Sequence, residues 1–327
     1  MNEPAVAVLI PCFNESRTVG KVVADFKKEL PQASIYVFDN NSTDETAVIA
    51  RNAGAIVIRE IKQGKGFVVA AMLSKVSADY YVMVDGDDTY AADCVKELLK
   101  PVLEGHADMV VGQRLAAHTT AAFRPLHIFG NRLVVGLINT IFSSKLTDVM
   151  SGYRAFTRGV AVSLPIVASG FDVETEMTLQ LLYRGYVIKE VPVPYKERPA
   201  GSTSKLSTIS DGAIVLLKIM GIFKAYKPLT FFGGLGFISL LAGTAPHLRV
   251  ALGLLDPSRQ LSLFDVIGSS VSILSFLTLS VAGVIVHTLN FRILEMTSIL
   301  IKTSQHVETG IVTANEDAAQ GYKIHAK

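Results

Sequence analysis

The sequence of 327 residues contains two cysteines, no tryptophan and almost no net charge, with a formal value of +2. Two cysteines do not supply the disulfide framework of a small secreted protein, so we expect no such framework. A nearly balanced charge predicts no general attraction to nucleic acid. The first residues also lack a basic stretch and a small-residue cleavage site. We therefore expect no signal peptide, and an N-terminus that stays in the cytoplasm.

Charged side chains are missing from two stretches near the C-terminus. None lies in the 21 residues between Lys227 and Arg249, or in the 26 residues between Asp265 and Arg292. A helix needs roughly 20 apolar residues to cross the hydrocarbon core of a membrane, and a buried core helix rarely needs so many. The sequence therefore predicts two membrane-spanning helices that form a hairpin.

Basic residues indicate on which side of the membrane the ends of this hairpin lie. Lysines and arginines flank the outer ends of the two uncharged runs, with fewer in the connecting segment. The positive-inside rule then predicts a multi-pass protein of the inner or plasma membrane with both termini in the cytoplasm. Just before the first run, residues 207–227 have the apolar and basic faces of a helix that lies in a membrane interface, although a core helix can show the same pattern.

These patterns divide the chain into four predicted parts. They are a globular domain at 1–206, an interfacial amphipathic helix at 207–227, a hairpin at 228–291 with spans at about 228–248 and 266–291, and a tail at 292–327. After a short helical continuation the tail is polar and aperiodic, so we expect it to be cytoplasmic and partly disordered.

Short apolar runs alternate with helical patterns in the first domain. Runs at 6–10, 34–38 and 55–59, and the run that ends at Asp85, are typical of buried strands, and a segment with helical spacing follows each of them. This alternation predicts an α/β fold built on a parallel, doubly wound sheet.

Three of these strands end in polar or acidic loops, at Asn14-Glu15, at Asp39 and at Asp85-Gly86-Asp87. The carboxyl ends of parallel strands meet at one edge of the sheet, where ligands of open α/β sheets bind. Carboxylate oxygens gathered on one turn suit Mg²⁺ or Mn²⁺, which would hold a diphosphate. Taken alone, the acidic turn has a helix-capping role as its simpler explanation. Three such loops together favour a nucleotide site.

Six motifs occur along the chain: Ile10-Pro11-Cys12-Phe13-Asn14-Glu15, Asp39-Asn40-Asn41-Ser42-Thr43-Asp44, Gly64-Lys65-Gly66, Asp85-Gly86-Asp87, Gly112-Gln113-Arg114 and Ser151-Gly152-Tyr153-Arg154. Their order and spacing resemble glycosyltransferase family 2, which implies the GT-A fold, a Rossmann-like, mostly parallel sheet with flanking helices. More narrowly, the chain resembles the polyprenyl-phosphate glycosyltransferases, among them the dolichyl-phosphate mannose synthases and the bacterial undecaprenyl-phosphate glucosyltransferases. The likeness covers residues 5–210, and the predicted hairpin matches the bacterial branch in architecture.

The resemblance implies roles for residues at the donor side of the site. Asp85 and Asp87 match the D-x-D metal motif, with Asp87 in direct contact with the metal and Asp85 shared between the ribose and the metal. A glutamine that can complete the metal shell in the mannose synthases is replaced here by Thr89. Lys65 is placed to neutralise phosphate charge. The other residues that the resemblance assigns to the nucleotide sugar are Pro11, Asn14, Glu15, Asp39 (to the base) and Gln113.

An acceptor that is a lipid phosphate requires cations rather than a general base. At neutral pH such a phosphate is mostly dianionic, with a second pKa of about 6, and is already nucleophilic. Asp148 then orients the sugar in preference to acting as a base, and we expect direct displacement with inversion at the anomeric carbon. UDP-glucose is the preferred donor and GDP-mannose the alternative. The candidate cations are Arg114, Arg132, Arg198 and Lys205, with Arg154 set aside as a partner of Asp148.

Two other functions share parts of this pattern. A processive polysaccharide synthase has the same fold and membrane spans, but its Q-x-x-R-W motif needs a tryptophan, which this chain lacks. A catalytically silent membrane scaffold would not need the complete set of loops. Bacterial relatives of this layout suggest a homo-oligomer. Asp88 reads as a turn-stabilising neighbour of the metal motif, and the acids Glu174 and Glu176 as favourable charges at the start of a helix.

Overall fold

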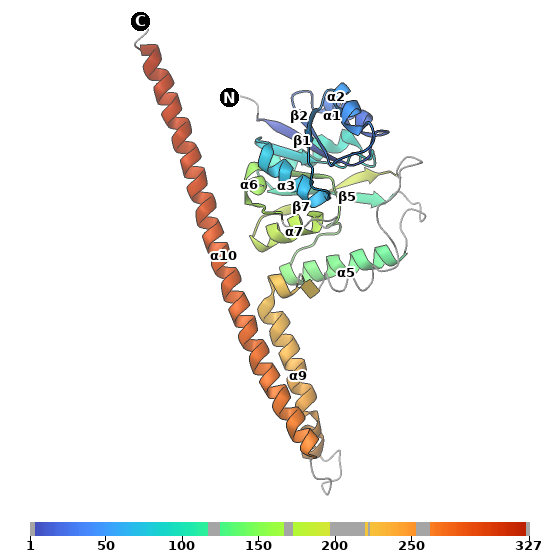
Figure 1. Ribbon diagram of the computed structural model, residues 1–327, viewed down its shortest axis with the longest axis vertical. Helices are drawn as coiled ribbons and strands as arrows, with labels where there is room; N and C mark the ends of the chain where they lie inside the picture. The colour runs from blue at the N-terminus through green and yellow to red at the C-terminus, as the bar shows by residue number, and fades with distance from the viewer. Residues whose placement is uncertain are drawn as a thin grey trace. The chain divides into compact units, whose positions relative to one another are not determined.

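The computed structural model describes residues 4–116, 125–166, 173–196, 220–221, 223–252 and 262–324 (Figure 1). The chain forms two compact units, Met1–Val215 and Leu216–Lys327. Most of the predicted interfacial helix, together with Arg198, Lys205 and the predicted boundary at 206–207, lies outside the described residues.

The first unit is built on a seven-stranded sheet with the order β3-β2-β1-β4-β6-β5-β7. All described neighbours run parallel except β6, which is antiparallel to both β4 and β5. The predicted α/β fold with a mostly parallel sheet and flanking helices is therefore confirmed, and β6 makes the sheet mixed. The strands are β1 (Val6–Cys12), β2 (Ser34–Asp39), β3 (Ile56–Arg59), β4 (Tyr80–Met83), β5 (Met109–Ala116), β6 (Arg154–Thr157) and β7 (Ile188–Tyr195).

Helices cover both faces of this sheet (Figure 1). Strand β1 shows why it carries an unbroken apolar run: Val8 and Ile10 belong to one core, whereas Ala7 and Leu9 belong to the other. Side chains alternate between the two faces of a strand, so a strand buried on both faces must be apolar at every position. The helices are α1 (Val19–Glu29), α2 (Thr46–Asn52), α3 (Lys65–Lys75), the short 3₁₀ helix η1 (Ala92–Cys94), α4 (Val95–Leu103), α5 (Pro125–Phe142), α6 (Arg158–Ser163) and α7 (Val173–Tyr183).

The reversed strand β6 determines what surrounds the acidic turn. Because β6 runs opposite to β4, with Arg154 paired to Met83, the residues just before β6 lie at the carboxyl end of β4. Gly152 is thus brought against Asp85, at the edge where the parallel strands β1, β2 and β4 end.

The second unit contains two long apolar helices, α9 (Pro228–Ala251) and α10 (Leu263–Ile324). The segments Pro228–Ala251 and Leu263–Thr297 are long and apolar enough to cross a membrane, with mean hydropathies of 1.5 and 2.0. Few of their residues are buried inside the protein, unlike those of a soluble core helix. The two helices fit the predicted transmembrane hairpin.

Small residues let α9 and α10 approach each other closely. A Cβ on Gly243 would lie 2.3 Å from the Cβ of Ser272, and one on Gly236 would lie 3.3 Å from the Cα of Phe276. The Ser269 hydroxyl adds a hydrogen bond of 2.7 Å to the carbonyl oxygen of Gly243. Close backbone approach at small residues is the usual basis of helix packing in membranes. Helix α10 continues to Ile324, so the tail is helical well beyond the short continuation that we predicted.

Candidate active site

The loop after β1 and the loop after β2 are joined by hydrogen bonds. The Asn14 side-chain oxygen accepts from the Thr43 amide at 2.8 Å, and the Asn14 amide donates to the Ser42 hydroxyl at 3.0 Å. The Glu15 amide donates to the Thr46 hydroxyl at 2.8 Å. Asn14 adopts a φ of 56°, a left-handed conformation that asparagine tolerates better than most residues. The two loops therefore form one continuous surface, as their shared position at the sheet edge predicted.

Asp39 ends β2 beside the last residue of β1. Its partner in the sheet register is Cys12, and Pro11 pairs with Phe38. The Asp39 carboxylate is buried and accepts from the Ser42 amide at 3.2 Å. Pro11 and Asp39, both assigned to the nucleotide by the resemblance, are thus held at one edge of the sheet by adjacent strands.

Asn40 connects these loops to the glycine-flanked lysine, a role that the sequence did not reveal. Its side-chain amide donates to the carbonyl oxygens of Glu60, at 3.1 Å, and Lys62, at 2.7 Å. Its side-chain oxygen accepts from the Gly64 amide at 2.8 Å. Gly64 has a φ of 135°, which a side chain would strain, and Lys65 follows as the first residue of α3. These hydrogen bonds therefore hold the backbone from which the Lys65 side chain extends.

Lys65 forms ion pairs with two carboxylates. Its Nζ lies 2.6 Å from Oδ1 of Asp85 and also contacts Oε1 of Glu174. Burial alone would lower the pKa of Lys65, but the charges of Asp85 and Glu174 outweigh it and raise the pKa above its ordinary value. Glu174 lies in the first turn of α7, and its contact with Lys65 gives it a partner beyond the helix-dipole effect predicted for it.

The acidic turn itself is tightly packed. A Cβ on Gly86 would lie only 2.5 Å from Sγ of Cys12, so no larger residue fits without a shift of its neighbours. The Thr18 hydroxyl donates to the Gly86 carbonyl oxygen at 2.7 Å. Asp87 is 3% exposed, and its Oδ1 accepts from the Thr89 hydroxyl at 2.6 Å. Thr89 therefore orients a carboxylate of the predicted metal motif at the position where the mannose synthases have their glutamine.

Asp88 has the structural role predicted for it. It adopts a φ of 59° in the turn, and its Oδ1 lies 2.7 Å from Nζ of Lys21 on α1. This ion pair fastens the turn to the helix that follows β1.

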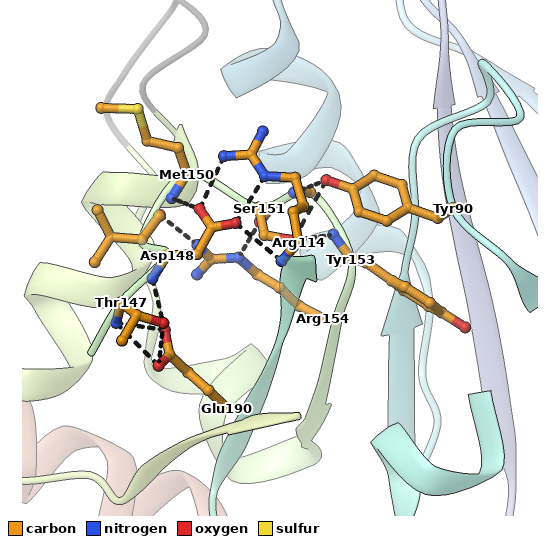
Figure 2. Close-up of polar contacts among 11 residues, drawn as sticks. Tyr90, Arg114, Thr147, Asp148, Met150, Ser151, Tyr153, Arg154 and Glu190 are labelled. Carbon is orange, nitrogen blue, oxygen red and sulfur yellow. Dashed lines mark hydrogen bonds and ion pairs between the residues drawn. The ribbon is translucent and has the colours of Figure 1, made fainter. Parts of the chain in front are cut away.

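A second polar cluster joins β5 to the segment before β6. Figure 2 shows the side chains of Arg114 and Asp148 facing each other, with Glu190 beside the backbone of Asp148 and Thr147. Nε and Nη2 of Arg114 donate to the two carboxylate oxygens of Asp148 at 2.7 and 2.8 Å. Glu190 on β7 accepts from the Asp148 amide at 2.7 Å. Arg114 also lies over the ring of Tyr195, 5.5 Å from its centroid.

This pairing determines the charge state of Asp148. Burial alone would raise the pKa of its carboxyl, but the hydrogen bonds and charge of Arg114 outweigh it and hold the pKa below its ordinary value. A carboxylate that stays ionised and bound on both oxygens to a guanidinium is a poor general base. The geometry therefore argues against a role for Asp148 as a base, whereas its role in orienting the sugar stays a prediction.

Arg154 is not the direct partner of Asp148. It is fully buried, and its guanidinium donates to the carbonyl oxygens of Ser151 and Val149 and to the hydroxyl of Thr178. Burial lowers its pKa to about 10. Arg154 therefore supports the loop from inside and does not reach a ligand at the surface.

The remaining predicted residues are placed less fully. Gln113 lies on β5 opposite Pro192 of β7, and Arg132 lies on α5. Arg198 and Lys205 fall outside the described residues. The structure thus brings together Pro11, Asn14, Glu15 and Asp39 on one side and Lys65, Asp85 and Glu174 on another, with Arg114 and Asp148 in a separate ion pair.

Asp85 and Asp87 provide the oxygen donors that suit a hard divalent cation. The Asp85 side chain is 26% exposed, so its carboxylate can be reached from solvent. In the part of the chain that the structure describes, no group of three His, Cys, Asp or Glu side chains is arranged to hold a metal. A cation at this turn would therefore take its other ligands from a diphosphate and water, which is how Mg²⁺ is commonly bound beside substrate phosphates.

Comparison with known proteins gives the class of this site. Residues 7–164 match the model of Glycosyl transferase family 2. The chain is 38% identical to Glycosyltransferase AglJ of Haloferax volcanii over an alignment of 248 residues. This alignment covers 76% of this chain and 81% of that relative. The chain is also 31% identical over 210 residues to the dolichyl-phosphate hexose transferase of the same organism. That alignment covers 64% of this chain and 90% of that relative.

A solved structure shares the fold. Glucosyl-3-phosphoglycerate synthase from Mycobacterium tuberculosis, in complex with Mn²⁺, UDP-glucose and phosphoglyceric acid, superimposes with a TM-score of 0.55 at 20% identity, covering 68% of this chain and 79% of that chain. At this identity the likeness concerns the fold alone. The protein is a glycosyltransferase with a GT-A-like mixed sheet. It belongs to glycosyltransferase family 2.

Proposed function

We propose that this protein is a membrane-bound, metal-dependent, inverting glycosyltransferase that transfers a hexose from a nucleoside diphosphate sugar to a polyprenyl phosphate. The observation that carries the proposal is the cluster of Asp85, Asp87 and Lys65 at the carboxyl edge of the sheet. Carboxylates for a divalent cation and an ammonium for phosphate oxygens are the groups that a diphosphate leaving group needs. UDP-glucose is the preferred donor.

The lipid acceptor is supported by three observations. The dolichyl-phosphate hexose transferase shares 31% of its aligned residues with this chain. Helices α9 and α10 each contain a segment that can cross a membrane. Asp148, bound by Arg114, is a poor base, and a phosphate acceptor needs none. We extend the proposal to a multi-pass protein with both termini in the cytoplasm, and to a homo-oligomer.

The residues divide the reaction between them. Asp85 and Asp87 would hold a divalent cation, which would supply positive charge to neutralise the departing nucleoside diphosphate. An oxygen of the lipid phosphate forms a bond to the anomeric carbon, while the bond from that carbon to the diphosphate oxygen breaks and its electron pair leaves with the diphosphate. Attack from the opposite face inverts the configuration. Asp148 keeps Arg114 in place, and Arg114, Arg132, Arg198 and Lys205 are the cations proposed for the acceptor phosphate.

The direct test is an assay of the full chain in membranes with a polyprenyl phosphate and a panel of radiolabelled UDP- and GDP-sugars. Asp87→Asn should abolish transfer that depends on added Mn²⁺ or Mg²⁺, because it removes a charged ligand while keeping the side-chain shape. Asp93→Asn, at an exposed position, is the matched control and should stay active. Full activity of Asp87→Asn would refute the metal site. If the wild type transferred no sugar to the polyprenyl phosphate, the proposed lipid acceptor would be refuted.

A further inference from the structure

Lys65 occupies a carboxylate that the proposed metal site also needs. Its ammonium lies 2.6 Å from Oδ1 of Asp85. The other oxygen of Asp85 faces Gly152, since a Cβ on Gly152 would lie 2.3 Å from Oδ2. One side of Asp85 is thus closed by the backbone of the segment before β6, and another by Lys65. A cation bound to Oδ1 of Asp85 would therefore lie close to the Lys65 ammonium.

Glu174 gives Lys65 a second anion to stay with. The Glu174 side chain is 5% exposed and contacts the Lys65 ammonium directly. Its backbone is held as well, because the Thr178 hydroxyl donates to the Glu174 carbonyl oxygen at 2.9 Å, and Arg154 in turn donates to that hydroxyl at 2.9 Å. Glu174 is therefore a fixed anchor for the end of the lysine side chain.

We propose that Lys65 is a built-in counterion of Asp85 that competes with the divalent cation, and that Glu174 is the positioning residue that retains Lys65 when Asp85 turns to the cation. The inference rests on the proposed metal site at Asp85 and Asp87. Lys65 has three donor protons, and the one released from Asp85 becomes available to an oxygen of the diphosphate. The exchange would couple arrival of the cation to presentation of Lys65 to the donor.

The charges at this edge of the sheet favour the exchange. Asp85 and Glu174 bring two negative charges into contact with the one positive charge of Lys65, and Asp87 adds a third on the same turn as Asp85. Without a cation, Lys65 limits the repulsion between Asp85 and Glu174. With a cation on Asp85, two positive charges would crowd the same oxygen unless Lys65 moves toward Glu174.

The test is a titration of the full chain in detergent with Mn²⁺ alone, without nucleotide. The electron paramagnetic resonance signal of free Mn²⁺ measures how much of the ion is bound. Lys65→Met should bind Mn²⁺ about tenfold more tightly than the wild type, because a competing charge within a few ångströms is gone. Glu174→Gln should bind it about tenfold more weakly, because Lys65 is left with Asp85 as its remaining partner. The two variants thus shift the affinity in opposite directions.

Controls separate these effects from general changes of charge and stability. Lys96→Met and Glu104→Gln make the same charge changes at exposed positions and should leave the Mn²⁺ affinity unchanged. If Glu174 were merely a counterion of the buried Arg154, Glu174→Gln would lower the melting temperature but not the Mn²⁺ affinity. The double variant Lys65→Met/Glu174→Gln removes both partners of the ion pair, and it should bind Mn²⁺ more tightly than Glu174→Gln alone.

Failure of this inference is distinguishable from failure of the proposed function. If the wild type binds Mn²⁺ and Asp87→Asn does not, the metal site stands. If folded Lys65→Met bound Mn²⁺ with the same affinity as the wild type, the proposed competition would then be overturned. Equal Mn²⁺ affinities of Glu174→Gln and Lys65→Met/Glu174→Gln would overturn it as well. If the wild type itself binds no Mn²⁺, with or without UDP-glucose, the metal site is refuted and the inference with it.

Discussion

Replacement of Arg114 by methionine should destabilise the protein more than replacement of its partner Asp148 by asparagine. Removing one member of a buried ion pair costs about 3–5 kcal/mol when the other charge is left uncompensated. In Arg114→Met, the Asp148 carboxylate keeps two amide donors at 3.2 Å, from residue 114 and from Met150. We therefore expect a cost near the lower limit, about 3 kcal/mol.

Asp148→Asn should destabilise the protein less, because water and the ring of Tyr195 still stabilise the charge of Arg114. Its side chain is 19% exposed, so water can reach the guanidinium, and it lies over the ring of Tyr195. Asp148→Asn also keeps one oxygen as an acceptor. A cost of about 1–2 kcal/mol follows, and the double variant should cost less than the sum of the two single changes.

The pH dependence gives an independent check of the sign. In the wild type the pKa of Asp148 lies below its ordinary value, so the pair stabilises the fold above the unfolded pKa of about 3.9 and loses this contribution as the pH falls through the folded pKa. In Arg114→Met, burial is no longer outweighed and the pKa of Asp148 should rise. The deficit of the variant relative to the wild type should therefore be largest at pH 7 and should shrink as the pH approaches the raised pKa.

Urea unfolding of the full chain in detergent micelles would measure these differences. Near-ultraviolet circular dichroism suits this protein, because most of its ten tyrosines belong to the α/β unit and it has no tryptophan. Equal costs for the two single variants, or a deficit of Arg114→Met that does not change with pH, would refute the reasoning.

Two glycine substitutions test close contacts in the two units. Gly86→Ala should destabilise the protein by about 1–3 kcal/mol in the same unfolding assay, because its Cβ would lie 2.5 Å from Sγ of Cys12. Adding Cys12→Ala should relieve most of that loss of stability, and strictly additive effects of the two changes would contradict this account. Gly243→Ala should lower the melting temperature in detergent, because its Cβ would meet Ser272 at 2.3 Å, whereas Gly234→Ala has nothing within 4 Å and should not; equal melting temperatures would show that Gly243 is not a packing contact.

The strands and the site loops were predictable because their signals are local. A strand buried on both faces needs apolar residues at every position, and β1 has them from Val6 to Ile10. The polar loops at Asn14 and Asp39 were expected side by side because parallel strands end at one edge, and hydrogen bonds join them. The reversal of β6 was not predictable, since its direction depends on which neighbours it pairs with rather than on its own residues.

Partner choice among charged side chains also lay beyond the sequence. Arg154 was the expected partner of Asp148, yet Arg114, 34 residues from Asp148, makes the ion pair. Likewise, nothing near Lys65 in the sequence points to Glu174. The acids at the start of α7 matched a helix-dipole pattern, and that pattern does not indicate the contact of Glu174 with Lys65 at the start of α3.

The sequence by itself determined the family, the alternation of strands and helices, and the two uncharged runs long enough to cross a membrane. These properties reside in the spacing of residue types along the chain, which is fixed before folding. The tertiary structure alone decided that Lys65 bridges Asp85 and Glu174, that Arg114 holds Asp148, and that Gly152 backs Asp85. Such contacts join residues distant in sequence, and they depend on how the strands are ordered and on which direction β6 takes.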